Sequence, residues 1–563
     1  MGKIDKAKAL WKDRDNQMRY MRWLLFYSKP YLGRIIFMML FSLMGTGISL
    51  LMTLVSKRII DDAIAGTDNM LIMLIVSYFA MIVLMQVFDV VWVLVKTMLN
   101  EKFTFGIRKQ VYDKILTSKW LDVQKYHTGD LMTRLTSDAG NIADGIITTL
   151  PSIVTLIIEL VLVFFTLFYY SPLLALFSLL IAPVAAIVSW LLGGKMKKLQ
   201  IKVQESEAAY RSFLQESIAN LLIMKSFTNE EYASDRLVGL REDRFYWVYK
   251  RTKLSMVSST VMSMAFQLGY IVAFTVGAFQ IAAKVITYGT MSVFLTLVNR
   301  VQSPIMQLAQ HIPKIVSILA SAGRVMELQN IEEEECAADN ISAENIGLKV
   351  EHVSFGYTDE PVLVDVNLDI KPGETVAVVG ESGIGKTTLI RLIMSFMEAD
   401  EGKITFYNAA GESEAANAGC RQFMSYVPQG NTLISGTIRE NIRMGRLDAT
   451  EEEMIRILKI VAAYDFIMKL PKGLDTVIGE KGHGLSEGQS QRIAIARALI
   501  RRAPFLILDE ATSALDEATE LAVLEGIAKF EPKPTCMVIT HRKSVLKYCD
   551  KEIMIENKKA TEI

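Results

Sequence analysis

The chain has 563 residues, of which 51% are hydrophobic and 22% charged. This size and composition exclude an intrinsically disordered chain and a single compact soluble domain, because soluble cores stop growing near about 250 to 300 residues. Lysine plus arginine and aspartate plus glutamate both number 61, yet residues 1–327 carry a net charge of +12 and residues 328–563 one of −12. The four cysteines all lie in the acidic half without CxxC spacing, so neither a zinc site nor a disulfide scaffold is indicated.

The basic half contains six apolar stretches of the kind that cross a bilayer, which takes about 20 helical residues. In chain order they span residues 35–55, 70–95, 146–169, 173–192, 257–283 and 285–298, the last continuing through Arg300. We therefore predict an α-helical membrane domain of six spans over residues 35–326, preceded by a polar segment at 1–34. A generic six-helix channel or anchor is the alternative interpretation of this half alone.

Basic side chains are concentrated in every second connection between these spans, and this bias predicts the orientation of the chain. The connections on one side hold 29 lysines and arginines and those on the other hold three. The first set comprises residues 1–34, 96–145 and 195–256, and the second comprises 56–69, 170–172 and 284. Both termini are therefore expected on the cytoplasmic side of a plasma or inner membrane. The two long inner connections keep a helical pattern, so the spans are expected to project into the cytosol.

Polar side chains inside spans are costly and usually face a cavity or a partner. The spans carry five of them, at Asp89, Glu159, Gln267, Asn299 and Arg300. Asp89 and Arg300 lie near the predicted cytoplasmic ends, where they can also reach water. Glu159 lies near the middle of its span, and we therefore predict that it lines the substrate cavity.

An acidic run at 332–335 begins a polar stretch, and we predict a linker over residues 327–347. Beyond it, strand and helix patterns alternate, which is typical of an α/β domain. The sequence thus predicts a second domain at 348–563.

In this domain a β-branched run at 376–379 is followed by a glycine-rich loop and then by a helical pattern. The loop consists of Gly380, Glu381, Ser382, Gly383, Ile384, Gly385, Lys386 and Thr387. Glycines let backbone amides turn toward phosphate oxygens, and the helix N-terminus adds its dipole. In this pattern the Lys386 ammonium spans the β- and γ-phosphates and the Thr387 hydroxyl ligates Mg²⁺. The fold class predicted for residues 348–563 is therefore a P-loop NTPase domain that binds ATP and Mg²⁺.

Two later apolar runs end in residues suited to hydrolysis. The run at 505–508 leads into Asp509 and Glu510, and the run at 536–540 leads into His541. Asp509 can hold Mg²⁺ through water, whereas Glu510 is placed to act as a general base on an attacking water. His541 can contact the γ-phosphate and orient that water. Taken alone, an acidic pair after a strand is equally a helix-cap signal, and a histidine there is usually structural.

A second helix N-terminus follows Leu485, because residues 490–502 have helical periodicity and Ser486 stands at the cap position. One nucleotide cannot easily use two distant helix N-termini of the same subunit. The pattern therefore indicates that the end at Ser486 to Gln489 serves a nucleotide held by a partner.

Taken in order, these residues resemble the ATP-binding-cassette (ABC) transporters, specifically the half-size exporter type with six spans before one cassette. The resemblance covers nearly the whole chain. The matching motifs are an aromatic loop at Tyr357, Walker A at 380–387, the Q-loop at Gln429, Gly479 to Gly482, the signature at 485–489, Walker B ending at Asp509, Glu510, the D-loop at 513–516 and the switch residue His541.

The resemblance implies roles for these positions in a head-to-tail dimer that encloses each ATP between two cassettes. The implied ATP-binding residues are Tyr357, Gly380, Glu381, Ser382, Gly383, Ile384, Gly385, Lys386, Thr387, Thr388 and Gln429. The implied catalytic residues are Glu510, His541 and Lys386, and the implied Mg²⁺ ligands are Thr387, Gln429 and Asp509. The implied trans-acting residues are Ser486, Glu487, Gly488, Gln489 and the D-loop residue Asp516. Coupling helices are expected near 121–128 and 226–234.

The resemblance implies an ATP-driven exporter of an amphipathic small molecule, lipid or peptide, working by alternating access as a homodimer or heterodimer in the lipid bilayer. Two alternatives stay open: an importer on the same fold, and a membrane-bound ATPase that regulates a partner without a substrate. Glu487 departs from the family pattern, where glycine is typical, and places a carboxylate near a triphosphate. Nucleic acid is not an expected partner, because the cassette half is acidic.

Overall fold

The computed structural model describes residues 18–66, 68–170, 172–336, 341–342, 344–358, 360–381, 383–430, 432–479, 482 and 484–563. Parts of the sequence predictions therefore lie outside the described residues: residues 1–17 of the N-terminal segment, residues 67 and 171 of the short connections, residues 337–340 and 343 of the linker, Ser382 of the phosphate loop, and positions 480 and 481 before the signature. The described backbone includes residues 173–192, but their side chains are not described. The chain divides into two compact units, a helical unit (residues up to 112 and 131–327) and an α/β unit (113–130 and 328–563).

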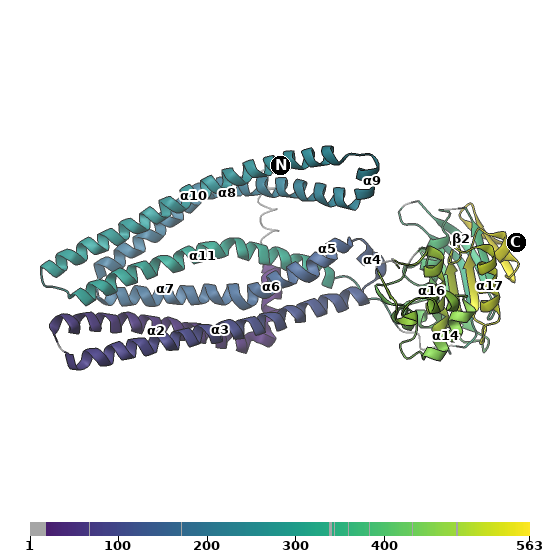
Figure 1. Cartoon of the computed structure of the whole chain (residues 1–563), viewed down its shortest axis with the longest axis horizontal. Coiled ribbons are helices and arrows are strands. Elements are labelled where there is room, and N and C mark those ends of the chain that lie inside the picture. Colours follow the sequence, from purple (N-terminus) through teal and green to yellow (C-terminus); the bar gives the residue numbers. More distant parts are fainter. Residues whose placement is uncertain are drawn as a thin grey trace. The chain divides into compact units, whose positions relative to one another are not determined.

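Long helices make up the helical unit (Figure 1). Its main elements are α2 (Leu32–Ala65), α3 (Asp68–Thr117, of which the last five residues belong to the α/β unit), α5 (Thr128–Thr133), α6 (Ala139–Asp144), α7 (Leu150–Tyr170), α8 (Pro172–Ala219), α9 (Leu221–Ser226), α10 (Glu230–Ala282) and α11 (Tyr288–Gln329). Two π-helical turns, η2 (Arg134–Asp138) and η3 (Gly145–Thr149), interrupt the segment before α7. Helices α8 and α10 run side by side and are joined through α9 (Figure 1).

The composition of these helices suits a lipid environment. Four described segments are long and apolar enough to cross a membrane: Met18–Ala65, Met70–Thr117, Thr128–Tyr170 and Glu230–Ala282. Large apolar side chains such as Phe37, Ile72 and Phe79 are exposed along them. Apolar helices with apolar outer faces are stable in a bilayer, where each helix satisfies its own backbone hydrogen bonds.

The helix boundaries differ from the sequence expectation in two places. The last predicted span begins at 285, but α11 begins at Tyr288, because Lys284 adopts a left-handed φ of 56° and residues 283–287 form a turn. The second short helix was expected near 226–234 and instead is α9 at Leu221–Ser226. There Thr228 takes a left-handed φ of 51°, which ends one helical segment and lets α10 begin.

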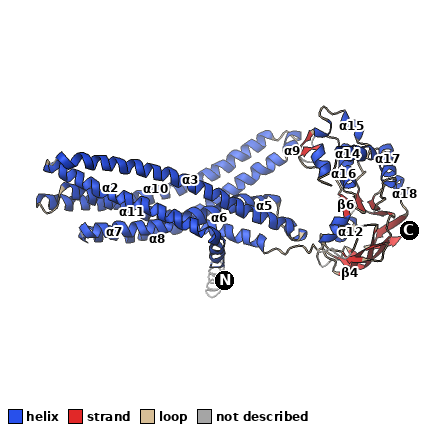
Figure 2. Cartoon of the chain, turned by 90° about the horizontal axis from the view of Figure 1, so that it is seen from below, coloured by secondary structure: helices blue, strands red, loops and turns tan. Residues whose placement is uncertain are grey.

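All strands of the described chain lie in the α/β unit (Figure 2). A six-stranded sheet has the order β12-β11-β3-β10-β9-β6, a four-stranded antiparallel sheet has the order β2-β1-β4-β5, and β7 pairs with β8. The strands are β1 (Ile346–Phe355), β2 (Leu363–Ile370), β3 (Thr375–Gly380), β4 (Glu401–Asn408), β5 (Ser413–Ala415), β6 (Met424–Val427), β7 (Gly436–Thr437), β8 (Val477–Ile478), β9 (Phe505–Asp509), β10 (Thr535–Ile539), β11 (Lys551–Glu556) and β12 (Lys559–Glu562).

Helices surround these sheets: α4 (Trp120–Gln124), α12 (Lys386–Ile393), α13 (Ile438–Arg443), α14 (Glu451–Ile460), α15 (Tyr464–Met468), α16 (Glu487–Ile500), α17 (Glu517–Ala528) and α18 (Lys543–Leu546). The central strands β9 and β10 are buried along their whole length. Strands that are covered on both faces have continuous apolar sequences, and for this reason both strands could be predicted from their apolar runs.

The register of the parallel strands brings their carboxyl ends to one edge. Ile539 of β10 pairs with Asp509 of β9 and with Val378 of β3, and β6 runs parallel to β9. The loops that follow β3, β6, β9 and β10 therefore emerge together. In open α/β sheets ligands bind at this edge. The predicted fold class, a helical membrane domain followed by an α/β domain, is confirmed.

Candidate nucleotide site

The phosphate loop connects β3 to α12 and depends on glycines at two tight positions. Gly380 has a φ of 155°, and a Cβ there would lie 2.6 Å from the Ile555 carbonyl oxygen. Gly385 has a φ of 115° and caps α12, and a Cβ there would lie 2.9 Å from Leu363. Side chains are therefore excluded from both ends of the loop. The amides of the first turn of α12 are left without a side-chain cap and can bind an anion.

Lys386 begins α12 and folds back over the loop. Its side chain is 7% exposed, and its Nζ donates to the carbonyl oxygens of Gly380 at 2.7 Å and Glu381 at 3.0 Å. Burial lowers the pKa of Lys386, while the nearby carboxylates of Glu510 and Asp509 act in the opposite direction. A buried ammonium at a helix N-terminus is suited to neutralise phosphate oxygens.

Asp509 ends β9 and is 3% exposed. The Tyr426 hydroxyl of β6 donates to its Oδ2 at 3.3 Å. Burial raises the pKa of Asp509, and the Tyr426 and Thr387 hydroxyls partly oppose that shift. The sequence analysis missed Tyr426, whose role follows from the pairing of β6 with β9 rather than from its spacing to the motif.

Glu510 lies at the centre of a polar cluster contributed by the four segments that follow β3, β6, β9 and β10. It has a left-handed φ of 49°, a conformation that costs energy for a residue with a side chain, and its amide donates to the Ile539 carbonyl oxygen at 3.1 Å. The Gln429 amide donates to Glu510 Oε2 at 2.7 Å. His541 Nε2 lies 3.0 Å from Glu510 Oε1 and 3.2 Å from Lys386 Nζ. The structure thus brings these four predicted residues together.

Tyr357 lies in the loop after β1 and is 46% exposed. Its ring meets Phe355 edge to face, with 5.2 Å between centroids. Its hydroxyl lies 3.4 Å from Thr388 Oγ1 and accepts a hydrogen bond from Arg391 Nη1 at 3.1 Å. An exposed ring fixed at its hydroxyl end can present a face to a flat aromatic ligand.

The predicted signature forms the N-terminus of α16. Ser486 accepts a hydrogen bond from the Gln489 amide at 3.3 Å, and the Gln489 side chain accepts one from the Ser486 amide at 3.0 Å, which completes a capping box. Glu487 is exposed in the first turn. A Cβ on Gly488 would lie 2.9 Å from the Ala514 carbonyl oxygen, so the D-loop packs directly against the signature.

The D-loop is held from both sides by residues that the sequence analysis missed. Gln491 of α16 donates to Ser513 Oγ at 3.1 Å and accepts from the Ala514 amide at 3.0 Å. Arg542, next to the predicted switch histidine, donates to the Ser513 carbonyl oxygen at 2.7 Å and to the fully buried Glu520 at 3.1 Å. Asp516 caps α17 by accepting from the Thr519 amide at 3.1 Å. No sequence spacing reveals this network, since its members are brought together by the fold.

The polar residues of the predicted spans are spread over several helices. Glu159 on α7 is half-buried. Arg300 on α11 donates to the Ser49 hydroxyl of α2. Asp89, Gln267 and Asn299 are exposed.

The whole chain is similar to known transporters. Residues 35–305 match a family model described as the ABC transporter transmembrane region, and residues 363–513 match one described as ABC transporter. A putative multidrug export ATP-binding/permease protein from Staphylococcus aureus is 31% identical over 94% of each chain, and its counterpart from a bovine strain is 30% identical over the same shares. The structure of a bacterial Atm1-family ABC exporter with ATP bound has a TM-score of 0.80 at 22% identity, covering 94% of this chain and 95% of that one.

Proposed function

The chain belongs to the ABC transporter family and is an integral membrane protein whose ATP hydrolysis drives transport. We propose that the residues beside the phosphate loop carry out this hydrolysis. The proposal depends above all on the cluster of Lys386, Gln429, Glu510 and His541 beside the phosphate loop. Four loops that emerge from one sheet edge contribute it, which is the arrangement that phosphoryl transfer to water needs.

In the proposed reaction Glu510 is the general base. Its carboxylate takes a proton from water as the water oxygen attacks the γ-phosphorus, and the bond from that phosphorus to the β,γ-bridging oxygen breaks. The contact between Gln429 and Glu510 would position the carboxylate, and His541 would orient the water and the γ-phosphate. Lys386 and the uncapped amides of α12 would neutralise the developing charge.

The residues around Asp509 fit Mg²⁺. Thr387, Asp509 and Gln429 offer hydroxyl, carboxylate and amide oxygens, the hard donors that Mg²⁺ prefers, and Asp509 is buried with one oxygen bonded to Tyr426. Bound Mg²⁺ would supply charge neutralisation of the β- and γ-phosphates. Asp509 would act on it through water.

We propose that each ATP is completed by a second cassette. The signature residues Ser486, Glu487, Gly488 and Gln489 stand at the N-terminus of a different helix from the phosphate loop, which favours a trans role for them. Because this chain contains Glu510 and His541, its own sites are competent for hydrolysis and a homodimer is sufficient, although a heterodimer with a second half-transporter fits equally. Both termini and the cassette would be cytoplasmic, with six spans crossing the bilayer.

We further propose that the transported substrate is an amphipathic small molecule, lipid or peptide, and that it moves outward. The support is the 31% identity over nearly the whole chain with proteins named for multidrug export. The apolar spans with few polar groups suit an amphipathic ligand, and Glu159 on α7 would contact it.

The test uses the full chain in lipid nanodiscs and proteoliposomes, with Glu510→Gln as the matched variant. We expect a dimer mass, Mg²⁺-dependent ATPase that Glu510→Gln reduces by about 10² or more while ATP binding survives, and outward movement of an amphipathic dye. Normal turnover in Glu510→Gln would reject its role as base. Uptake instead of export would favour the importer. ATPase without movement of any substrate would favour the regulatory ATPase.

The cavity assignment is tested by Glu159→Gln, with Asp89→Asn as the control because it removes an exposed carboxylate from another span. Glu159→Gln should change the stimulation of ATPase by substrate and leave basal ATPase intact, whereas Asp89→Asn should change neither. An unchanged substrate response in Glu159→Gln would remove this residue from the cavity.

A further inference from the structure

A chain of contacts links Tyr357 to Trp120, the first residue of α4, through the side chain of Arg391. Arg391 lies on α12, the helix that begins at Lys386, and its guanidinium donates to the Tyr357 hydroxyl at 3.1 Å. The same guanidinium lies over the ring of Trp120, with 5.2 Å from Cζ to the ring centroid. Arginine can do both at once, because its planar group stacks through its face and donates through its edge.

Trp120 is the first residue of α4 and the only tryptophan within residues 113–130 and 328–563. Its ring also meets Phe396, with 5.5 Å between centroids. Phe396 also contacts Arg421, whose Cζ lies 4.3 Å from the ring centroid. The half-buried Trp120 ring therefore contacts both Arg391 and Phe396 of the α/β unit.

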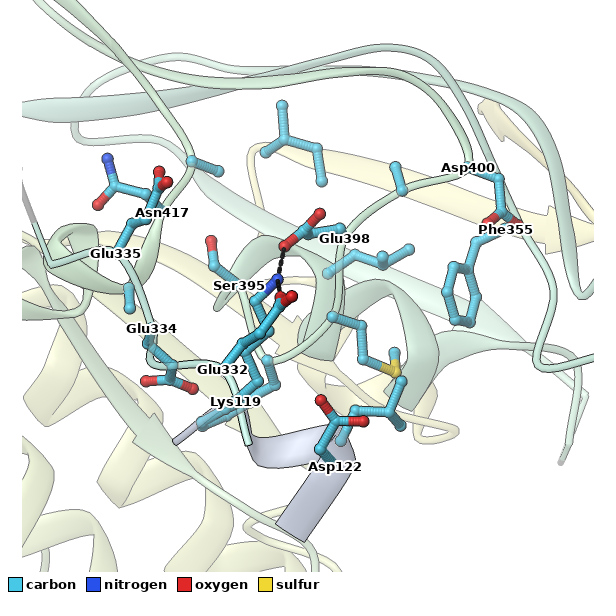
Figure 3. Close-up of a pocket in the computed structure, with 18 of the residues that line it drawn as sticks. Lys119, Asp122, Glu332, Glu334, Glu335, Phe355, Ser395, Glu398, Asp400 and Asn417 are labelled. Carbon is cyan, nitrogen blue, oxygen red and sulfur yellow. Dashed lines mark ion pairs between the residues drawn. The ribbon is translucent and has the colours of Figure 1, made fainter. Parts of the chain in front are cut away.

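Within the α/β unit, the segment around α4 is held in place by the acidic run at 332–335. Lys119 donates its amide to the Glu332 carbonyl oxygen at 2.9 Å, and the Glu334 amide donates to the Thr117 carbonyl oxygen at 2.9 Å. The Lys119 ammonium pairs with Glu332 and Glu398, each at 3.0 Å (Figure 3). Arg421 holds Glu334 through two hydrogen bonds. The acidic run at 332–335 thus secures the position of Trp120.

Tyr357 and the α4 segment also border one cavity of about 1320 Å³. Its walls include Leu121 and Asp122 from α4, Phe396, and Tyr357 with its neighbour Phe355 (Figure 3). A displacement of α4 would therefore remove both the ring that supports Arg391 and one wall beside Tyr357.

We propose that Arg391 and Trp120 are positioning residues that hold the Tyr357 ring ready for adenine, so that the affinity for ATP depends on both side chains. The inference rests on the proposed function, in which Tyr357 contacts adenine. A half-exposed ring without its hydroxyl anchor samples more orientations, and ATP binding must then select one of them.

The first experiment measures KM and kcat for ATP on the full chain in nanodiscs. Tyr357→Ala tests the adenine contact itself and should raise KM. Arg391→Ala and Trp120→Ala should each raise KM about three- to tenfold and change kcat less than KM, since the hydroxyl bond and the cation–π contact are each lost. Tyr357→Phe keeps the ring but loses the hydroxyl contacts to both Arg391 and Thr388, so it should raise KM at least as much as Arg391→Ala. Trp120→Phe keeps an aromatic ring under Arg391 and should restore most of the affinity.

Arg456→Ala is the matched control, because it removes an exposed arginine from α14 of the same unit. Should Tyr357→Ala leave KM unchanged, the adenine contact and hence the proposed function at this position is wrong. Should Tyr357→Ala raise KM while Arg391→Ala and Trp120→Ala match Arg456→Ala, the positioning role is overturned and the adenine contact stands. The double variant should be no worse than Arg391→Ala, because Trp120 acts through Arg391; additive losses would contradict that relation.

Discussion

Two helix N-termini in the α/β unit are built in opposite ways. Helix α12 begins after a left-handed glycine, Gly385, with no side-chain cap, and Lys386 lies beside its open amides. Helix α16 begins at Ser486, whose side chain caps it in a reciprocal pair with Gln489, and it carries the acidic Glu487 in its first turn. Both ends have the positive pole of a helix dipole.

This difference teaches how one chain can hold two parts of a composite site. The end of α12 leaves its backbone amides without a side-chain cap, so they can bind phosphate without a partner. At the end of α16, the Ser486 and Gln489 side chains accept hydrogen bonds from two backbone amides. This helix end is therefore stable without an anion, and a bound anion would stabilise it less than it would stabilise the end of α12. The α12 end is therefore the better suited of the two to bind phosphate without help from a partner.

The largest effect is expected at the open end. Lys386→Ala should reduce Mg²⁺-dependent ATPase by about 10² to 10³ or more, because it removes the ammonium next to the phosphate loop and to His541. Lys459→Ala, an exposed lysine on α14, is the control and should leave the rate unchanged. Substantial hydrolysis in Lys386→Ala would mean that α12 is not the primary phosphate site.

At the capped end the close packing of Gly488 is the next target. A Cβ there would lie 2.9 Å from the Ala514 carbonyl oxygen and 3.2 Å from Leu515, so Gly488→Ala should displace the D-loop and lower ATPase about tenfold. Gly239→Ala in α10 is the control, since a Cβ there meets nothing within 4 Å. Equal activity in the two variants would show that the contact between signature and D-loop is not needed for turnover.

Removal of the cap separates stability from catalysis. Ser486→Ala should cost about 1 kcal/mol of folding free energy, and Thr437→Ala and Thr450→Ala, which remove the same type of capping box from α13 and α14, should cost a similar amount. Thermal unfolding measures this cost. Only Ser486→Ala should also lower ATPase, through its role toward a partner's nucleotide. If all three variants lose activity to the same extent, Ser486 acts only as a structural cap.

The sequence predicted the fold class and the family because the relevant signals are local. The phosphate loop lies between one strand and one helix, and Glu510 and His541 directly follow buried strands, so each was readable from a few neighbouring residues. Parallel strands then bring these loops to one edge. The family and the ATP-driven transport are confirmed by the comparisons, whereas the individual site roles stay predictions.

What the sequence could not predict depends on contacts between distant segments. Arg542 is bonded to Glu520 and the D-loop, and Arg391 is stacked on Trp120, yet no spacing along the chain marks either pair. The spans pose a different difficulty, because the apolar residues of α2 and α3 are not confined to one side of the helix and leave no polar stripe that shows which side faces a cavity. The sequence places Glu159 within a span, but it does not predict which side chains surround this carboxylate.

The smallest effect is expected at Glu487, where the two helix ends differ in charge. An exposed carboxylate in the first turn of α16 interacts favourably with the positive end of the helix dipole, but it repels a triphosphate that approaches the same helix end. Glu487→Gln should therefore lower KM for ATP about two- to fivefold, and the difference should shrink at high salt because exposed charges are screened. Glu452→Gln makes the same change in the first turn of α14, where no nucleotide role is proposed, and is the control. If both variants lower KM equally, the effect comes from net charge; if only Glu487→Gln does so, the capped end carries a built-in resistance to closure that the open end lacks.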